Sequence, residues 1–376
     1  MRGELAAAPQ EDANIGTVVS AVGVLAGIGA VAVFSATAPD ADATFSPYFV
    51  RHAAGLAIGA LLMLGAASIR LNGWRVLAYP LYGVSIAALV ATLVLGFVAG
   101  GARRWVMLPG GVVFQPVELA KLATVLALCA YLFRSDTRGD LSPARCLRAL
   151  GFAVVPMGLC LLQPDLGSAV VIAALSALVL FVAGAPLRLL ALPSLAGAAG
   201  IAVYCALNPY AMKRVLAFRD PFLDATGIGF QLVQSFVAFG RGELWGTGVG
   251  NGLQKLDYLP EAHTDFILSV IAEETGLIGV SFVLGFFFAL VWAGMRIAQR
   301  SPHRFGLLLG FGVTALLGLQ AILNGAVVMG LLPPKGLTLP FVSYGRSSLL
   351  ICSIAAGILI AVARSADVAK RGSRSA

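Results

Sequence analysis

The most polar stretch inside this apolar sequence is 251–279, where charged and polar side chains stand directly before a long apolar run. Its clustered polar residues are Gln254, Lys255, Asp257, Glu261, His263, Thr264 and Asp265. A charge at the mouth of a membrane helix costs less than one at mid-bilayer, but it still needs a reason. Asp265 stands nearest the run, where a carboxylate can accept a proton, bind a metal ion or cap the helix.

Two of these roles can be weighed from the neighbouring residues. No Glu or Gln follows Asp265 three residues later, so a capping box is incomplete. His263 is one of only three histidines in the chain, which provides no cluster of metal ligands.

A second polar group surrounds the start of the apolar run 113–133, with Arg103 and Arg104 before it and Glu118 and Lys121 inside it. Glu118 and Lys121 are three residues apart on one helical face, so they can simply pair with each other. Two arginines and a lysine at one helix mouth also suit a diphosphate, since Arg supplies forked donors and Lys a point charge. Both interpretations stay open.

The third group is Gln163-Pro164-Asp165, a tight join between two apolar runs. Asp165 directly precedes the second run and can act as its N-cap. On the outer face of a membrane the same carboxylate can instead hold a divalent cation or orient a neighbouring arginine.

The fourth group is the segment 333–348, PPKGLTLPFVSYGRSS, which includes Lys335 and Ser343. Its prolines and glycines predict a stiff, non-helical re-entrant turn between two spans. Such backbone is tolerated at membrane depth only where it is buried in protein or lines a cavity. The segment is therefore either a structural hinge or part of a site.

The elements that must position these groups are membrane helices. The chain is 59% hydrophobic and 12% charged, with a mean hydropathy of +0.90, whereas soluble domains carry about 25% charged residues. We expect an all-α polytopic membrane protein, one integral membrane domain over 1–376, with about ten spans of bilayer length. The predicted spans are 15–36, 50–69, 76–98, 113–133, 147–162, 166–184, 187–207, 266–293, 305–331 and 347–363.

Orientation follows from the basic residues, because Lys and Arg favour cytoplasmic loops. Most of the 26 lysines and arginines fall on one side if both termini are cytoplasmic, so the net charge of +8 reflects topology rather than nucleic-acid binding. The segment 208–265 then becomes a large extracytoplasmic loop before the eighth span, with an amphipathic helix at 227–240. The outer cations, which topology does not require, indicate an anionic partner there: Arg103, Arg104, Lys121, Lys213, Arg214, Arg219, Arg241, Lys255, Lys335 and Arg346.

Five sequence stretches together resemble the SEDS family of peptidoglycan polymerases. They are GARRWV at 101–106, QPVELAKL at 115–122, QPDLGSA at 163–169, QKLDYLPEAHTDFI at 254–267 continuing into EETGLIG at 273–279, and PPKGLTLPFVSYG at 333–345. YLPEAHTDF and PPKGLTLPF look more like the division branch, FtsW, than the elongation branch, RodA. Arg346 departs from the pattern, because the family usually continues Ser-Tyr-Gly with a second glycine. A cation there either adds a phosphate contact or narrows the cavity.

The resemblance implies a glycosyltransferase that joins lipid II disaccharides into glycan strands on the outer face of the cytoplasmic membrane. Asp265 matches the family's essential aspartate and is our candidate catalytic base, and it is also the candidate ligand for a divalent cation, Mg²⁺ or Mn²⁺. A leaving diphosphate needs positive charge. The candidate residues for binding lipid II and its diphosphate are Arg104, Lys121, Lys335, Glu118, Gln163, Asp165, His263 and Ser343.

The resemblance also implies a setting: the bacterial inner membrane, at the division septum, beside a class B penicillin-binding protein and other divisome proteins. One alternative is a lipid II flippase, although a transporter tends to hold its substrate near the bilayer midplane and the charges here concentrate at the outer end. A second alternative is the same polymerase chemistry in cell elongation.

We expect reporter fusions to verify the orientation. A phosphatase that is active only outside the cytoplasm should be inactive when fused near Asp140 and active when fused near Lys213, because the basic residues assign these loops to opposite sides. A fluorescent protein that matures only in the cytoplasm should give the reverse pattern. A cytoplasmic signal from the fusion near Lys213 would overturn the topology.

Overall fold

The computed structural model describes residues 8–38, 45–99, 102–108, 112–133, 141–207, 212, 218–225, 227, 229–255, 259, 262–334 and 336–374. Ten long helices in this part of the chain match the ten predicted spans. They are α1 (Ala8–Ala36), α2 (Pro47–Ser68), α3 (Leu71–Leu95), α4 (Pro116–Leu132), α5 (Pro143–Leu162), α6 (Leu166–Val182), α7 (Leu187–Leu207), α10 (Ile267–Arg300), α11 (Arg304–Val328) and α12 (Arg346–Arg374).

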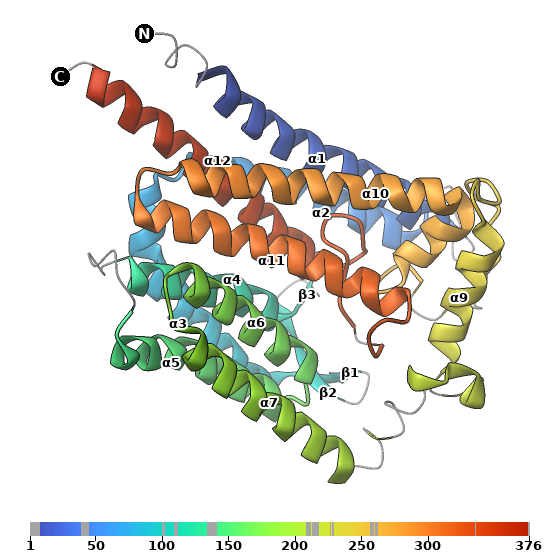
Figure 1. Ribbon diagram of the computed structural model, residues 1–376. Helices are drawn as coiled ribbons and strands as arrows, with labels where there is room; N and C mark the ends of the chain where they lie inside the picture. The colour runs from blue at the N-terminus through green and yellow to red at the C-terminus, as the bar shows by residue number, and fades with distance from the viewer. Residues whose placement is uncertain are drawn as a thin grey trace.

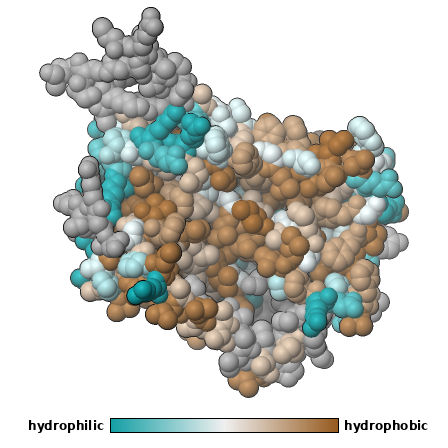
Figure 2. Space-filling model, viewed as in Figure 1, coloured by the Kyte–Doolittle hydropathy of each residue, from teal (hydrophilic) through white to brown (hydrophobic). Residues whose placement is uncertain are grey.

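Seven of the described helices are long and apolar enough to cross a membrane by length and composition. α4 and α6, with 17 residues each, are shorter, and the apolar part counted in α7 is Leu187–Gly200. Both termini lie at one end of the bundle, while α9 (Phe230–Gly242) and the strands lie toward the other (Figure 1). Hydrophobic residues cover most of the face between the hydrophilic ends (Figure 2), as expected of a helical membrane protein.

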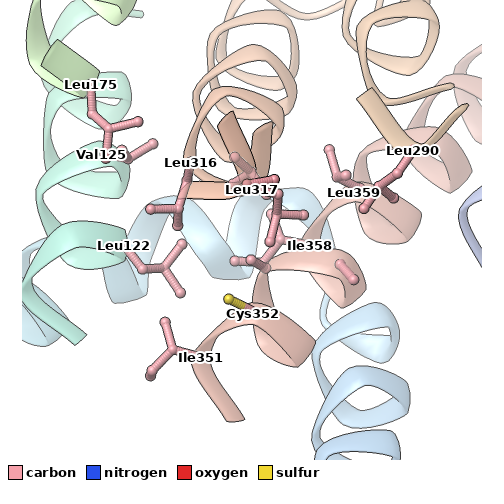
Figure 3. Close-up of a cluster of buried hydrophobic side chains, with 14 of the residues drawn as sticks. Leu122, Val125, Leu175, Leu290, Leu316, Leu317, Ile351, Cys352, Ile358 and Leu359 are labelled. Carbon is pink, nitrogen blue, oxygen red and sulfur yellow. The ribbon is translucent and has the colours of Figure 1, made fainter. Parts of the chain in front are cut away.

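The centre of the bundle is built on α11, which packs against α4, α6, α10 and α12. Side chains from these helices interdigitate in one apolar cluster (Figure 3). Its labelled members are Leu122, Val125, Leu175, Leu290, Leu316, Leu317, Ile351, Cys352, Ile358 and Leu359. α2 and α3 are the least buried of the seven spans. The polar ends of α4, α11 and α12 are therefore held by well-packed helices.

A small antiparallel sheet, which the sequence patterns do not predict, connects α3 to α4. Its strands are β1 (Phe97–Ala99), β2 (Ala102–Leu108) and β3 (Val112–Phe114), in the order β1-β2-β3. The predicted span 76–98 is therefore wrong at its C-terminal end, because α3 ends at Leu95 and β1 follows. The strands pair Val98 with Arg103 and Met107 with Val113, so this hairpin fixes the position of the arginines of β2.

The predicted amphipathic helix is confirmed as α9, which packs against α10. Its Ser235 hydroxyl lies 2.9 Å from the Ser269 hydroxyl of α10 and donates to Val328 O at 2.7 Å. α9 therefore connects the start of α10 to the end of α11. This connection lies next to the polar stretch that precedes α10.

α10 is broken at Gly276, whose φ of 66° and ψ of −166° are not helical. The groups freed by the break bond to the segment after α9: Thr247 N donates to Glu273 O at 2.9 Å, and Leu277 N to Glu243 O at 2.9 Å. Position 246 requires glycine, because its φ is +78° and a β-carbon there would lie 2.2 Å from Glu274 O. Water is not available in an apolar environment to bond with these backbone groups. The residues after α9 therefore supply their hydrogen-bond partners.

The two carboxylates beside the break are fully paired, as the cost of a buried charge requires. Glu273 accepts from Leu253 N and Gln254 N at 3.0 Å each and lies 3.5 Å from Arg241. Glu274 pairs with Lys255 at 2.8 Å.

This corrects the expectation that Arg241 and Lys255 serve an external anion. Their partners are the protein's own carboxylates on α10. The Glu274 carboxylate and the Lys255 ammonium also bond to Ser35 of α1, at 2.6 and 2.8 Å. The pairs tie residues after α9 to two membrane helices, α1 and α10.

The segment between α11 and α12 is non-helical over its described residues, as predicted. Leu337 and residues 339–343 are buried, whereas Leu331, Leu332 and Gly336 are exposed. It passes close to α1 at Gly29, where a β-carbon would lie 2.7 Å from Phe341 O and from Val342 Cα. Phe341 itself has a positive φ of 65°, which costs a residue with a β-carbon about 1–2 kcal/mol. Surrounding contacts must therefore hold this turn in place.

We expect Gly29→Ala to destabilise the protein by about 1–3 kcal/mol, because the new methyl group overlaps the backbone of the turn. Gly23→Ala, on the same helix with nothing within 4 Å of its β-carbon, is the matched control and should be neutral or stabilising. Thermal unfolding in detergent measures both. Equal melting temperatures for the two variants would contradict the contact.

Candidate active site

The strand β2 brings Arg104 to the tight turn between α5 and α6. Its Nε donates to Gln163 O at 3.5 Å, and its Nη2 donates to Pro164 O. The Gln163 side chain in turn donates to Leu89 O of α3 at 2.9 Å. Backbone carbonyls of the turn therefore orient the guanidinium, and Gln163 anchors the turn to its neighbouring helix.

Asp165 is the N-cap of α6, accepting from Ser168 N at 3.1 Å and from the Ser168 hydroxyl at 2.7 Å. The capping interpretation is thus confirmed. The strand β2, which carries Arg104, and the helix α6, which Asp165 caps, both contact α4. The turn and the helix that carries Glu118 and Lys121, separate in the sequence, therefore lie on neighbouring elements.

Glu118 and Lys121 form a buried ion pair in the first turns of α4, with Nζ 2.8 Å from Oε1. The Lys121 residue is only 1% exposed. Gln320 of α11 donates to the second carboxylate oxygen at 3.4 Å. The pairing expected from their spacing is present, so contact between Lys121 and an external ligand would require this pair to open.

Asp265 lies one residue before the N-cap of α10, which is Phe266. Its carboxylate faces the segment between α11 and α12, since a β-carbon at Gly336 would lie 3.0 Å from Oδ2. Asn324 of α11 donates to Asp265 O at 2.8 Å and to Leu337 O at 2.5 Å. One amide therefore clamps the aspartate backbone to that segment. Lys335 lies outside the described residues.

His263 and Ser343 hold the same segment from two sides. The His263 ring packs 5.0 Å from Tyr48 and 5.5 Å from Tyr344, and its carbonyl accepts from Tyr344 N at 2.9 Å. The buried Ser343 hydroxyl accepts from Leu339 N at 2.8 Å. Both residues stabilise the turn that faces Asp265, and their contact with substrate stays a prediction.

Two amides of α11, Gln320 and Asn324, were missed by the sequence analysis. They are one helical turn apart, about 6 Å along the axis, and connect the Glu118–Lys121 pair to the backbone of Asp265. A possible signal was their position in the otherwise apolar run LLGLQAILNGAVV, because amides in a membrane helix need partners. They make the two predicted clusters neighbours along one helix.

Among the residues that the structure describes, no three His, Cys, Asp or Glu side chains gather as a metal site. Arg346 is the first residue of α12 and is half-buried. The next residue, Ser347, accepts from Gln115 N at 2.9 Å, so the starts of α4 and α12 are fastened together beside the ion pair.

A family model described as a cell cycle protein, FtsW/RodA/SpoVE, matches residues 17–368. The chain belongs to this family. The match spans nearly all the described helices and confirms the resemblance that the five sequence stretches carry. The candidate site residues, from Arg104 in β2 to Asp265 before α10, all fall within it.

Similar proteins and solved structures support the same family assignment. A protein of Trichlorobacter lovleyi named probable peptidoglycan glycosyltransferase FtsW is 41% identical over 341 residues, 89% of each chain. A chain from a structure titled for the coordination of polymerization and crosslinking by a peptidoglycan synthase complex has a TM-score of 0.77 at 34% identity, covering 93% of this chain and 97% of that one. RodA of Thermus thermophilus gives 0.68 at 31% identity, covering 92% and 95%.

We expect Lys121→Met to destabilise the protein by about 3–5 kcal/mol, because it leaves the Glu118 carboxylate buried and unpaired. The double variant Glu118→Gln/Lys121→Met removes both charges at similar volume and should recover most of that loss. Melting temperatures of the single and double variants in detergent measure this. A double variant no more stable than Lys121→Met would contradict the pair's electrostatic role.

Proposed function

We propose that this chain is a peptidoglycan glycosyltransferase that polymerises lipid II on the outer face of the cytoplasmic membrane during septal wall synthesis. The observation that carries the proposal is the placement of Asp265 and the Glu118–Lys121 pair along α11, with Arg104 on the strand β2 that contacts α4. The names of its FtsW relatives support the same activity.

In the proposed reaction, the C4 hydroxyl of one disaccharide attacks the anomeric carbon of the growing strand. The new glycosidic bond forms as the bond to undecaprenyl diphosphate breaks, and the hydroxyl proton must leave. Asp265 is the proposed acceptor, because a sugar hydroxyl is a weak nucleophile that a positioned carboxylate activates. Its backbone is held by Asn324, which fixes where the carboxylate can reach.

The leaving diphosphate gains charge as its bond breaks, and cations aimed at it lower the barrier. Arg104, anchored on backbone carbonyls that use only part of its five donors, is well suited to bind phosphate oxygens. Lys335 is proposed for the same role from the sequence motif. Lys121 would join them only if its pair with Glu118 opens.

A divalent cation remains a proposal. Asp265 is the carboxylate that would hold it, and substrate phosphates would provide further oxygen ligands, which is how Mg²⁺ commonly binds. When bound, such an ion would neutralise the leaving diphosphate.

A class B penicillin-binding protein is the proposed partner, with other divisome proteins at the septum. Support comes from the likeness to a chain of a peptidoglycan synthase complex. The flippase alternative is disfavoured, because the proposed substrate groups lie at the ends of α4 and α10 rather than at mid-helix positions, where transporters bind.

We expect Asp265→Asn to lower lipid II polymerisation by about a hundredfold or more, because it removes the proton acceptor at constant size. The assay uses purified protein with its transpeptidase partner. Asp220→Asn is the matched control: Asp220 is an exposed cap in the same external segment, bonded to Phe222 N, and Asn caps equally well.

Near-normal polymerisation by Asp265→Asn would overturn the assigned role. Rescue of that variant by excess Mg²⁺ or Mn²⁺ would make Asp265 a metal ligand instead of a base. If wild-type protein moves lipid II between leaflets without polymerising it, the flippase alternative replaces the proposed function.

A further inference from the structure

A cavity of about 1070 Å³ opens at the end of the bundle opposite the candidate active site. Its walls come from the α2–α3 turn, the end of α4, the α10–α11 turn and α12. α11 runs from this cavity to Asn324 near the site, and its 25 residues span roughly 37 Å. The cavity thus lies at the end that carries both termini (Figure 1), which the basic residues assign to the cytoplasm.

Four arginines from three parts of the chain line this cavity: Arg70, Arg75, Arg304 and Arg364. Among the described residues of its lining there is no Asp or Glu. Arg75 lies 5.0 Å from the centre of the Phe133 ring, and Arg364 donates to Ala67 O at 3.3 Å. Such contacts orient a guanidinium and leave most of its five donors available.

Arg70, Arg75 and Arg364 form no ion pair with any described residue and are exposed. Topology alone explains why arginines stand at this end. It does not explain why arginines from separate helices converge on one concave site whose described lining holds no acid, since repulsion between like charges opposes that arrangement.

Two helix N-termini open onto the same cavity. α3 follows Arg70 and α11 follows His303, and neither cap residue makes a side-chain bond to the first turn. The first N–H groups of a helix need partners, and its dipole favours an anion there. Helix ends and arginines therefore point to the same kind of ligand, a phosphate group.

The surroundings indicate a lipid rather than a soluble phosphate. Large apolar side chains on α2 and α3 are exposed up to the rim of the cavity, including Leu61, Leu64 and Val76. Acyl chains can lie along these helices while the headgroup enters the basic cavity. Basic pockets between helices on the cytoplasmic side are suited to phospholipid headgroups.

We propose that this cavity binds an anionic phospholipid of the inner leaflet whose headgroup carries two phosphates, as in cardiolipin. Two phosphates offer acceptors for the exposed guanidiniums of Arg70, Arg75 and Arg364 and for the two helix N-termini. The volume exceeds what a single phosphate fills. The site is separate from the proposed catalytic residues and would couple the enzyme to the lipid composition of its membrane.

Native mass spectrometry of the purified full chain tests the proposal, with cardiolipin, phosphatidylglycerol and undecaprenyl diphosphate as probes. Wild-type protein should retain cardiolipin at least about tenfold more strongly than phosphatidylglycerol, because two phosphates engage twice the cations. Arg70→Gln/Arg75→Gln should remove that preference. Arg148→Gln/Arg296→Gln removes equal charge from exposed arginines at the same end but outside the cavity, and should keep it.

The melting temperature of each lipid-free variant shows whether it is folded, and Arg364→Gln on a different helix provides a second test if the double variant is not. If the control pair loses the preference for cardiolipin to the same extent, the preference depends on total charge rather than on the cavity, and the proposal is overturned. Retained preference in the cavity variants would also overturn it. A preference for undecaprenyl diphosphate would assign the cavity to the substrate's own diphosphate instead.

Discussion

Backbone amides and carbonyls that leave a helix inside an apolar bundle find no water, so another part of the protein must bond to them. Two departures from helix define this structure: the break of α10 at Gly276 and the segment between α11 and α12. The first is completed by residues after α9, and the second by Asn324 and the carbonyl of His263. The second repair lies at Asp265, because the Asn324 amide also bonds to Asp265 O, whereas the first lies roughly 16 Å further along α10. The fold and the candidate site therefore share the hydrogen bonds of Asn324.

The same constraint governs the charges. Glu118, Glu273 and Glu274 are each buried with a cation, and truncating one member of such a pair strands the other. Loss of activity in a single charge variant therefore does not by itself identify a substrate contact. Comparison with Glu118→Gln/Lys121→Met separates these effects for the pair. A double variant that regains stability but still fails to polymerise lipid II places the Glu118–Lys121 pair, rather than Lys121 alone, in the reaction.

Helices and motifs could be predicted from the sequence because both are local patterns. The ten spans follow from runs of apolar residues, and the caps and tight joins from their flanking residues, such as Asp165. The sheet was missed because its short strands are stabilised by pairing across a turn rather than by their own composition. Arg241 and Lys255 were assigned wrongly because their partners lie on α10, beyond the reach of any helical spacing. Gln320 and Asn324 carry no motif, so only the packing of α11 reveals them.

The contacts of α1 have a consequence for how the protein is made. Ser35 bonds to Glu274 and Lys255, and Gly29 lies against the turn before α12. α1 thus enters the membrane with a polar side chain to satisfy, and the partners of Ser35 follow 220 and 239 residues later in the chain. Because the turn that faces Asp265 lies between α11 and α12 and packs against α1, it can close only after these three helices have been inserted.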